Sequence, residues 1–422
     1  MFAKIKKIYK EYPKAFKVLT FATFIDQIGS FLLYPFFAWY VTERFGVGMI
    51  EVGILFSIFS IGNIFGSTIG GALADKYGRR VIVLIGLIVS GIGSILMGLA
   101  NNLNTFYLIA AFLGLIGNFG GPARQAMVPD LLPKEKQAEG FGILRVAFNL
   151  SAVIGPILGG FMATRSFMLL FISDAISSII TAIIVFVVIP ETKPQTQDVT
   201  SKESVMKTLI GYKDVVKDWK FMIFIAVSAI TVLVYMQMNG PLSVYLRDIH
   251  GFPIENFAWL VSMNALIVVV FQFWITKMIS KYAPMKMMAF GTIFLMIGFG
   301  MYGFVSEPYL FFVAMAIITV GECIVFPLGQ STAAAFAPED KRGRYMAMYA
   351  FQWMIPNLFG ILVAGLVMEY IGPNWLWYFA ALLSLLSIIG FLLLEKITTV
   401  RILKEKEPIE DEFTEMAIPS IE

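Results

Sequence analysis

Long apolar runs, separated by short polar or charged breaks, recur along nearly the whole chain. A helix needs roughly 20 apolar residues to cross a hydrocarbon core of about 30 Å. Breaks at charged residues, prolines and glycine- or asparagine-rich points delimit runs near 15–42, 50–74, 81–100, 105–128, 139–164, 167–189, 221–246, 255–279, 285–305, 308–333, 344–370 and 374–395. The pattern therefore predicts an all-α membrane protein with twelve transmembrane helices.

Composition supports a membrane protein and argues against an enzyme. The 422 residues are 58% hydrophobic and only 14% charged, and their mean hydropathy of +0.79 lies above the range of soluble domains. The single cysteine, Cys323, and the single histidine, His250, leave no disulfide within one chain and no ordinary Cys/His metal site. No Ser/His/Asp, Cys/His or paired-carboxylate constellation is present. We expect no cofactor, no enzymatic activity and no nucleic-acid partner.

The positive charges are distributed unevenly between the two sides of the predicted membrane domain. An even number of spans places both termini on one side, and all but four of the 32 lysines and arginines fall in segments on that side. Arg44, Arg165 and Arg247 lie on the other side, and Arg145 lies within a span. Because short cytoplasmic segments are enriched in lysine and arginine, we expect both termini in the cytoplasm.

The long polar connection 190–220 divides the spans six and six. We expect an N-terminal half at 1–189, a cytoplasmic linker at 190–220, a C-terminal half at 221–395 and a cytoplasmic tail at 396–422. The linker carries apolar residues at helical spacing with lysines among them, which indicates an amphipathic helix on the anionic leaflet. A merely solvated linker is the alternative.

The two halves are related in sequence. An offset of 205 residues aligns Tyr40 with Tyr245, Pro122 with Pro327 and, without a gap, further prolines, glycines and tyrosines from the first span to the fifth. Many secondary transporters are built from paired halves with a site between them near the bilayer midplane. The repeat therefore indicates a transporter in which one half moves against the other.

The loop between spans 2 and 3 reads "GGALADKYGRR" at 70–80. It resembles the signature G-x-L-x-D-x-x-G-R-[RK] of the major facilitator superfamily, with Gly71, Leu73, Asp75, Gly78, Arg79 and Arg80 at the matching positions. We expect Gly71 to allow close helix approach and Gly78 to serve the tight turn. The resemblance implies the twelve-helix fold of that family and a cytoplasmic latch, in which Asp75 faces the N-terminus of span 11 and Arg79 pairs with Asp130. An ordinary positively charged loop is the alternative.

Span 5 contains "SAVIGPILGG", which resembles the antiporter motif G-P-x-x-G-G of the drug:proton exporters in the same superfamily. The matching residues are Gly155, Pro156, Gly159 and Gly160. Glycines permit backbone contact between helices and proline kinks a helix, so a plain packing motif is the alternative.

One feature of these exporters is missing. They often carry an arginine in the middle of span 4, where this chain has Ala110. Arg124 lies nearer the cytoplasmic end of span 4, and Arg145 lies about six residues inside span 5. Both remain candidates for a role in coupling, although Arg145 can equally snorkel to the membrane interface.

Two carboxylates lie deep in predicted spans. By the helical rise, Asp26 is about 17 Å into span 1 and Glu322 about 21 Å into span 10, where an ionised carboxylate costs about 2.5–3.5 kcal/mol or more. Helical spacing aligns them with other polar, aromatic and methionine side chains on spans 1, 7 and 10. We expect a proton and substrate cavity lined by Asp26, Ser30, Tyr34, Thr231, Tyr235, Met238, Glu322 and Phe326. A structural acid is the alternative for each carboxylate, and Asp174, nearer the outer surface, is expected to be structural.

A carboxyl group in a low-dielectric cavity holds a proton more readily than one in water, and it can exchange that proton when the cavity opens to the other side. With the two motif resemblances, this predicts a monomeric plasma-membrane transporter that exports lipophilic or cationic small molecules in exchange for protons. A transporter of one defined metabolite, such as a sugar or organic anion, is the alternative, favoured by arginine or several amides at the cavity centre. A lipid translocase and a receptor that moves no solute are alternatives of another class.

Overall fold

The computed structural model describes residues 11–192, 215–338 and 341–406, and these residues are helical with no strand among them. The first half of the chain forms α2 (Lys14–Leu33), α3 (Phe37–Phe45), α4 (Met49–Tyr77), α5 (Arg79–Leu99), α6 (Leu103–Phe112), α7 (Gly120–Leu131), α8 (Lys134–Ala163) and α9 (Phe167–Val188). The second half forms α11 (Trp219–Tyr235), α12 (Pro241–His250), α13 (Ile254–Ile279), α14 (Pro284–Tyr302), α15 (Pro308–Phe336), α16 (Arg342–Tyr349), α17 (Phe351–Tyr370) and α18 (Pro373–Lys406).

Twelve segments of the described chain are long and apolar enough to cross a membrane, which confirms the predicted number of spans. Some spans consist of two labelled helices that a short irregular turn separates. Helices α2 and α3, for example, make up the first span, Lys14–Phe45. Most of the expected linker, with its amphipathic helix, lies outside the described residues, as do residues 407–422 of the expected tail. Helix α18 continues to Lys406, beyond the predicted end of the last span at 395.

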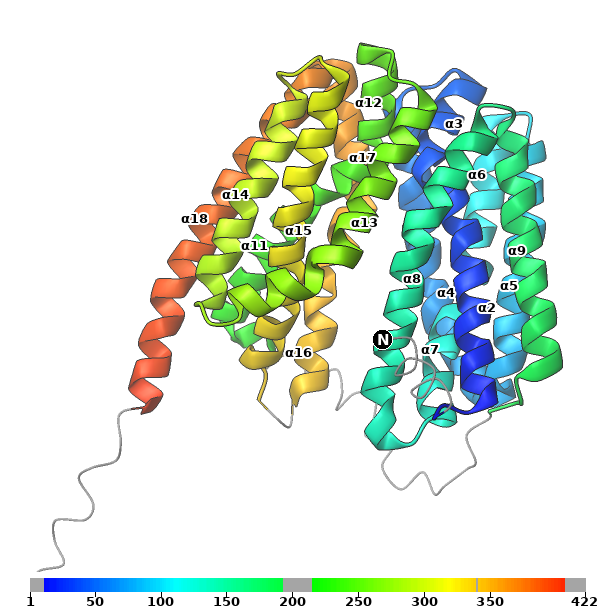
Figure 1. The fold of residues 1–422 in the computed structure, drawn as a ribbon, viewed down its shortest axis with the longest axis horizontal. Helices are drawn as coiled ribbons and strands as arrows, with labels where there is room; N and C mark the ends of the chain where they lie inside the picture. Colours follow the sequence, from blue (N-terminus) through cyan, green and yellow to red (C-terminus); the bar gives the residue numbers. More distant parts are fainter. Residues whose placement is uncertain (1–10, 193–214, 339–340, 407–422) are drawn as a thin grey trace, which may run out of the picture.

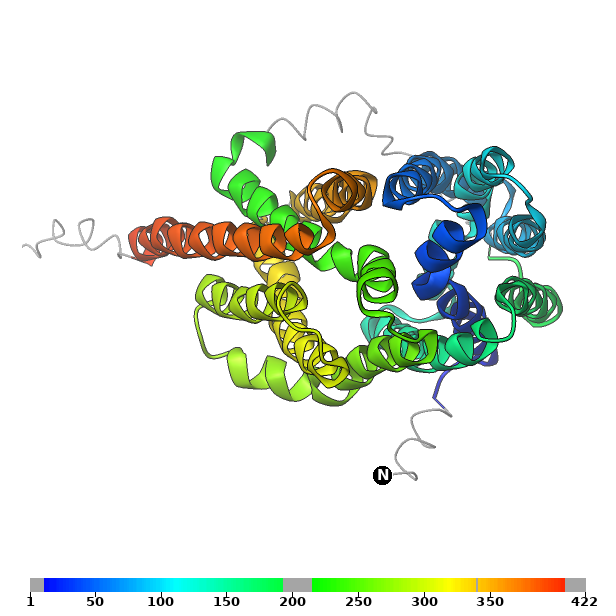
Figure 2. The same cartoon turned by 90° about the horizontal axis from the view of Figure 1, so that it is seen from above.

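The helices form two bundles, α2–α9 and α11–α18 (Figures 1 and 2). The bundles meet chiefly where α4 packs against α17 and α8 packs against α13. Both ends of the described chain lie on one face of the molecule, at the lower edge of Figure 1. We call this the terminal face and the other the opposite face. The contact between bundles therefore involves one pair of helices on each side of the central region.

The bundles are joined at the opposite face and diverge toward the terminal face (Figure 1). At the opposite face, the Arg247 guanidinium donates to the carbonyl of Trp39 at 3.1 Å and lies 5.4 Å from the centre of its ring. The backbone N–H of Ile50 donates to Glu369 at 2.9 Å. Deeper in the same interface, the Ser57 hydroxyl donates to the carbonyl of Leu358 at 2.5 Å. The structure is therefore closed at the opposite face.

Three spans are interrupted where the sequence predicts continuous helix. A 3₁₀ turn at Tyr34–Phe36 separates α2 from α3, and another at Met236–Asn239 separates α11 from α12. Pro35 and Pro241 explain the breaks, because proline lacks the N–H of a helix interior and clashes with the preceding turn. A π-helical turn at Leu113–Gly117 separates α6 from α7, a feature frequent at functional sites. Two of the three breaks line cavities described below, through Tyr34 in one break and Leu113 and Gly117 in the other.

Candidate functional site

Asp26 is held in an ion pair inside the N-terminal bundle. Its Oδ2 lies 2.8 Å from Nη1 of Arg124 on α7, and the Ser178 hydroxyl on α9 donates to Oδ1 at 3.4 Å. The Asp26 side chain is buried. Arg124 and Asp26 are 98 positions apart, so the sequence places each near the site but does not indicate their pairing. The pair satisfies a charge that would otherwise be costly in this environment.

A cavity of about 640 Å³ surrounds this ion pair. Arg145 on α8 lines it together with Arg124, so two guanidinium groups face one carboxylate there. Amide side chains also line it, namely Gln27, Asn118 and Gln125. This cavity therefore carries a surplus of positive charge and several groups that can both donate and accept hydrogen bonds.

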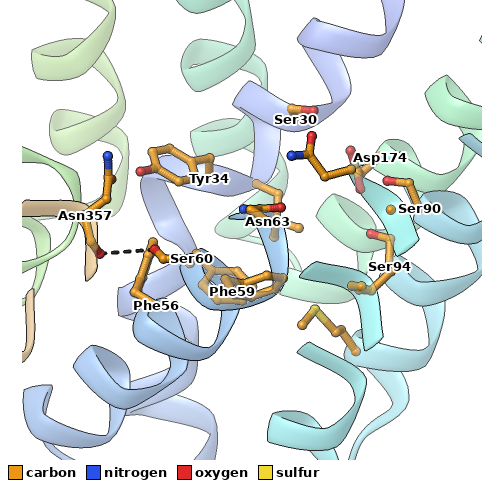
Figure 3. Close-up of a pocket in the computed structure, with 16 residues that line it drawn as sticks. Ser30, Tyr34, Phe56, Phe59, Ser60, Asn63, Ser90, Ser94, Asp174 and Asn357 are labelled. Carbon is orange, nitrogen blue, oxygen red and sulfur yellow. Dashed lines mark hydrogen bonds between the residues drawn. The ribbon is translucent and has the colours of Figure 1, made fainter. Parts of the chain in front are cut away.

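A smaller cavity of about 380 Å³ adjoins the first through shared lining residues, among them Ser30 and Asn118. Figure 3 shows Asp174 beside Ser90 and Ser94 at one end of it and Tyr34, Phe56 and Asn357 at the other. Among the described residues that line this cavity, Asp174 is the only one with a charged side chain. The expectation of a purely structural Asp174 did not anticipate this position.

Glu322 is held by neutral donors in the C-terminal bundle. Asn264 on α13 donates to its Oε2 at 2.8 Å and to the Thr319 hydroxyl at 2.9 Å. The Tyr235 hydroxyl also reaches the carboxyl group. No salt bridge joins Glu322 to a cation in the part of the chain that the structure describes.

Aromatic rings stand next to Glu322. Tyr235 packs edge-on against Phe326, with ring centroids 4.8 Å apart, and Phe326 lies 5.1 Å from Trp353 of α17. The three rings form one aromatic cluster beside Glu322.

The predicted cavity residues fall into three environments. Asp26, Ser30 and Tyr34 line the two cavities. Glu322, Tyr235 and Phe326 form the cluster just described. Thr231 and Met238 are buried, and the Thr231 hydroxyl donates to the carbonyl of Val227 in its own helix at 3.2 Å. Neither of these two is among the residues that line the two cavities.

The loop motif is only partly assembled in this conformation. Arg79 forms an ion pair with Asp130 and donates to the carbonyl of Ala126 at 2.8 Å. The Asp75 side chain is 68% exposed and lies 4.0 Å from Arg79, so it is not packed against span 11. Arg80 donates to the carbonyl of Phe186. The divergence of the bundles at the terminal face explains why Asp75 and span 11 are apart.

Of the two glycines in the loop motif, Gly78 has the turn conformation that the sequence predicted, whereas Gly71 does not lie at a close contact between helices. Gly78 has φ of 113°, a conformation that glycine adopts far more easily than other residues, as expected for a tight turn. The close helix approach occurs at Gly70, where a Cβ atom would lie 2.6 Å from Cα of Phe119. A Cβ at Gly71 would meet only Pro122, at an ordinary 3.9 Å.

The span 5 motif packs α8 against both bundles. A Cβ atom at Gly155 would lie 2.9 Å from the backbone carbonyl carbon of Phe31, and one at Gly159 would lie 2.8 Å from the Phe36 ring. A Cβ at Gly160 would instead face Ala258 of α13, in the other bundle. Ser151, which stands where the motif usually has another glycine, donates to the carbonyl of Phe24 at 3.1 Å. The motif therefore lies at the junction of α2, α8 and α13.

Comparison with known proteins agrees with this architecture. The family model described as Major Facilitator Superfamily matches residues 19–308 and 236–418. A "Na(+), Li(+), K(+)/H(+) antiporter" of Planococcus maritimus is 25% identical over 419 residues, covering 91% of this chain and 96% of the relative. The "Multidrug resistance protein MdtH" of Escherichia coli strain K12 is 22% identical over 352 residues, covering 83% of each chain.

Solved structures share the fold at low sequence identity. The nucleoside transporter NupG superposes with a TM-score of 0.79 at 14% identity, covering 90% of this chain and 100% of its own. A bacterial homologue of the human lysosomal transporter Spinster, in an inward-facing conformation, gives a TM-score of 0.74 at 13% identity, covering 90% and 96%. With twelve apolar helices, two bundles and a family match across most of its length, the chain is a multi-pass membrane transporter, not an enzyme, and belongs to the Major Facilitator Superfamily.

Proposed function

We propose that this protein is a proton-coupled antiporter that exports lipophilic or cationic small molecules by alternating access. The observation that carries the proposal is Glu322, a carboxyl group deep in a span that neutral donors hold beside aromatic rings. Such a group can be neutral or charged without breaking an ion pair. The names of the two relatives, one a cation/proton antiporter and one a multidrug resistance protein, support the same class of activity.

We place the protein in the plasma membrane as a monomer, with both termini in the cytoplasm. The uneven distribution of lysine and arginine supports this orientation. The terminal face is then cytoplasmic, and the described conformation is closed to the outside. Asp75, Arg79 and Asp130 lie at the cytoplasmic ends of their helices, where Asp75 would meet span 11 once the bundles close.

In this mechanism Glu322 exchanges its proton between the two sides. Facing outward, the carboxyl group takes up a proton as the substrate leaves. Facing inward, it releases the proton to the cytoplasm as a new substrate binds. One pH unit supplies about 1.4 kcal/mol per coupled proton, and 100 mV adds about 2.3 kcal/mol per charge moved. The cycle needs no cofactor.

A second candidate function is the transport of one defined metabolite, such as an organic anion. The larger cavity favours it, because Arg124, Arg145 and three amide side chains line that cavity and only Asp26 opposes their charge. Guanidinium groups and amides recognise a carboxylate or phosphate by directed hydrogen bonds. A lipophilic cation would have to pass this positive surface.

Flux in proteoliposomes with an imposed pH gradient separates these functions. The panel contains lipophilic cations, sodium, sugars and organic anions. We expect the pH gradient to drive accumulation of lipophilic cations on the side that the opposite face of the protein contacts. This accumulation should collapse when a protonophore dissipates the gradient. Selective uphill movement of one anion or sugar would instead establish the second function. Movement of labelled lipid alone would indicate a translocase, and no flux of any compound would indicate a receptor.

A further inference from the structure

We propose that Asp174 is the anchor for the positive group of an aromatic organic monocation, which binds in the smaller cavity under the closed opposite face. This proposal rests on the proposed function and adds to it a substrate site distinct from Glu322. The sequence indicated a structural acid at this position, and neither the loop motif nor the span 5 motif involves it.

Asp174 is a buried carboxylate positioned to face a ligand. It is 8% exposed, lies in α9 and lines the cavity. No salt bridge joins it to a cation among the described residues, whereas Arg124 already neutralises Asp26 nearby. Gly29 on α2 makes room for it, since a Cβ atom there would lie 3.1 Å from Oδ1 of Asp174. The close contact between α2 and α9 at this glycine therefore leaves room for the carboxylate.

The rest of the cavity suits the aromatic part of such a ligand. Four rings line it, those of Tyr34, Phe37, Phe56 and Phe59. Phe37 packs edge-on against Phe56 with centroids 5.9 Å apart, and Tyr34 packs edge-on against Phe56 at 6.1 Å. Aromatic rings attract cations and stack on aromatic ligands. A volume of about 380 Å³ lies within the range of small-molecule sites.

The same lining argues against a bare alkali ion. A desolvated alkali ion requires several oxygen ligands that converge closely on one point. Asp174 is the only charged oxygen ligand in the described lining, and seven of the other lining residues are apolar or aromatic. The organic cation is therefore the occupant that the lining favours.

The site also touches the interface that closes the opposite face. Ser60 of α4 and Asn357 of α17 both line the cavity, and they are hydrogen bonded to each other across the two bundles. Separation of these helices would open the site to the opposite face. A ligand anchored at Asp174 would then leave outward.

The test measures equilibrium binding to the purified full-length protein, with no gradient. The probes are methyltriphenylphosphonium and triphenylphosphine oxide, a neutral molecule of similar shape. We expect Asp174→Asn to weaken phosphonium binding by at least about tenfold, or ~1.4 kcal/mol. Phosphine oxide binding should change by less than about twofold, well within that energy. Asp174→Glu should retain most of the affinity for phosphonium. Glu255→Gln, which removes an exposed carboxylate, serves as the matched control.

Three outcomes would overturn the proposal. One is unchanged phosphonium binding by a folded Asp174→Asn protein. Another is equal affinity of the wild-type protein for the phosphine oxide and the phosphonium. This outcome can be measured even if the Asp174→Asn protein does not fold. The third is displacement of phosphonium from the wild type by sodium chloride but not by N-methylglucamine chloride. Because binding is measured without a gradient, failure of uphill export contradicts the proposed function and leaves the Asp174 result standing.

Discussion

At the residue scale, two carboxylates that look alike in the sequence have different partners in the structure. Asp26 and Glu322 each stand alone in an apolar span, at similar depth. Arg124 neutralises Asp26, while Asn264 and Tyr235 hold Glu322 without a positive charge. An ion pair resists a change in protonation, because protonation leaves the arginine unpaired. Glu322 is free of that penalty, which favours it over Asp26 as the proposed proton carrier.

The ion pair between Asp26 and Arg124 should matter for stability more than for coupling. Arg124→Met leaves Asp26 buried without its partner, a loss of about 3–5 kcal/mol in buried pairs. We expect a marked fall in the Tm of the purified protein, and recovery of much of that fall in the double variant Asp26→Asn with Arg124→Met. Arg165→Met, at an exposed position outside both cavities, is the control. Additive effects of the two substitutions would show that the pair is not energetically coupled.

Glu322→Gln should uncouple transport from protons. The glutamine side chain keeps the volume and can still accept the hydrogen bond from Asn264, which lies 2.8 Å from the native carboxylate. It cannot ionise. We expect a folded protein that binds substrate with little pH dependence, exchanges substrate downhill and no longer accumulates it against its gradient. Uphill export by this variant with the pH dependence of the wild type would assign the proton to another group.

At the scale of elements, helix α8, which contains Pro156, packs against both bundles. Pro156 leaves the carbonyl of Ala152 without its helical donor, and the motif glycines around it set the contacts with α2 and α13. An interior proline costs a helix about 3 kcal/mol. The strain is therefore expected to serve movement of α8 and not stability.

Pro156→Ala should separate these two roles. Restoring the missing hydrogen bond is expected to leave Tm unchanged or raise it, whereas the initial rate of export in proteoliposomes falls several-fold because α8 no longer bends. Ala152→Leu, at a half-buried position one turn earlier, controls for packing changes in the same helix. A variant with a lowered Tm and a normal export rate would make the motif a packing feature only.

The elements were more predictable than the site. Spans are visible in the sequence because each must bury its own backbone polar groups in a long apolar helix. The breaks at Tyr34–Phe36 and Met236–Asn239 were missed, although Pro35 and Pro241 signal them, because apolar residues continue through both. The partners of the acids were less accessible. Asn264 and Arg124 reach them across 58 and 98 positions, and only packing decides which helices meet.

At the scale of the whole molecule, a carboxylate of one bundle lies at a helix N-terminus of the other on the closed side. Glu369, near the end of α17, accepts a hydrogen bond from the N–H of Ile50 in the first turn of α4. The positive end of the α4 dipole favours this charge. A Cβ atom at Gly48 would lie 2.6 Å from Cδ of Glu369, so this glycine permits the approach. On the terminal face, where the bundles diverge, Asp75 remains exposed. The two acids thus occupy comparable places at opposite ends of the interface between α4 and α17.

This arrangement predicts that Glu369→Gln shifts the conformational equilibrium toward opening of the opposite face. An anion at a helix N-terminus contributes about 0.3–2 kcal/mol, and a loss of that size changes the ratio of two states by about twofold to thirtyfold. Spin labels at Thr164→Cys and Ser306→Cys, exposed positions on the two bundles, would report the separation at the opposite face once Cys323 is replaced by alanine. We expect the longer distance to gain population in Glu369→Gln.

Asp75→Asn, which removes a carboxylate from the terminal face, is the matched control and should not widen the opposite face. Unchanged distances in Glu369→Gln would mean that Arg247, Ser57 and Ser60 hold the bundles together without it, because these residues make the other described hydrogen bonds across that interface.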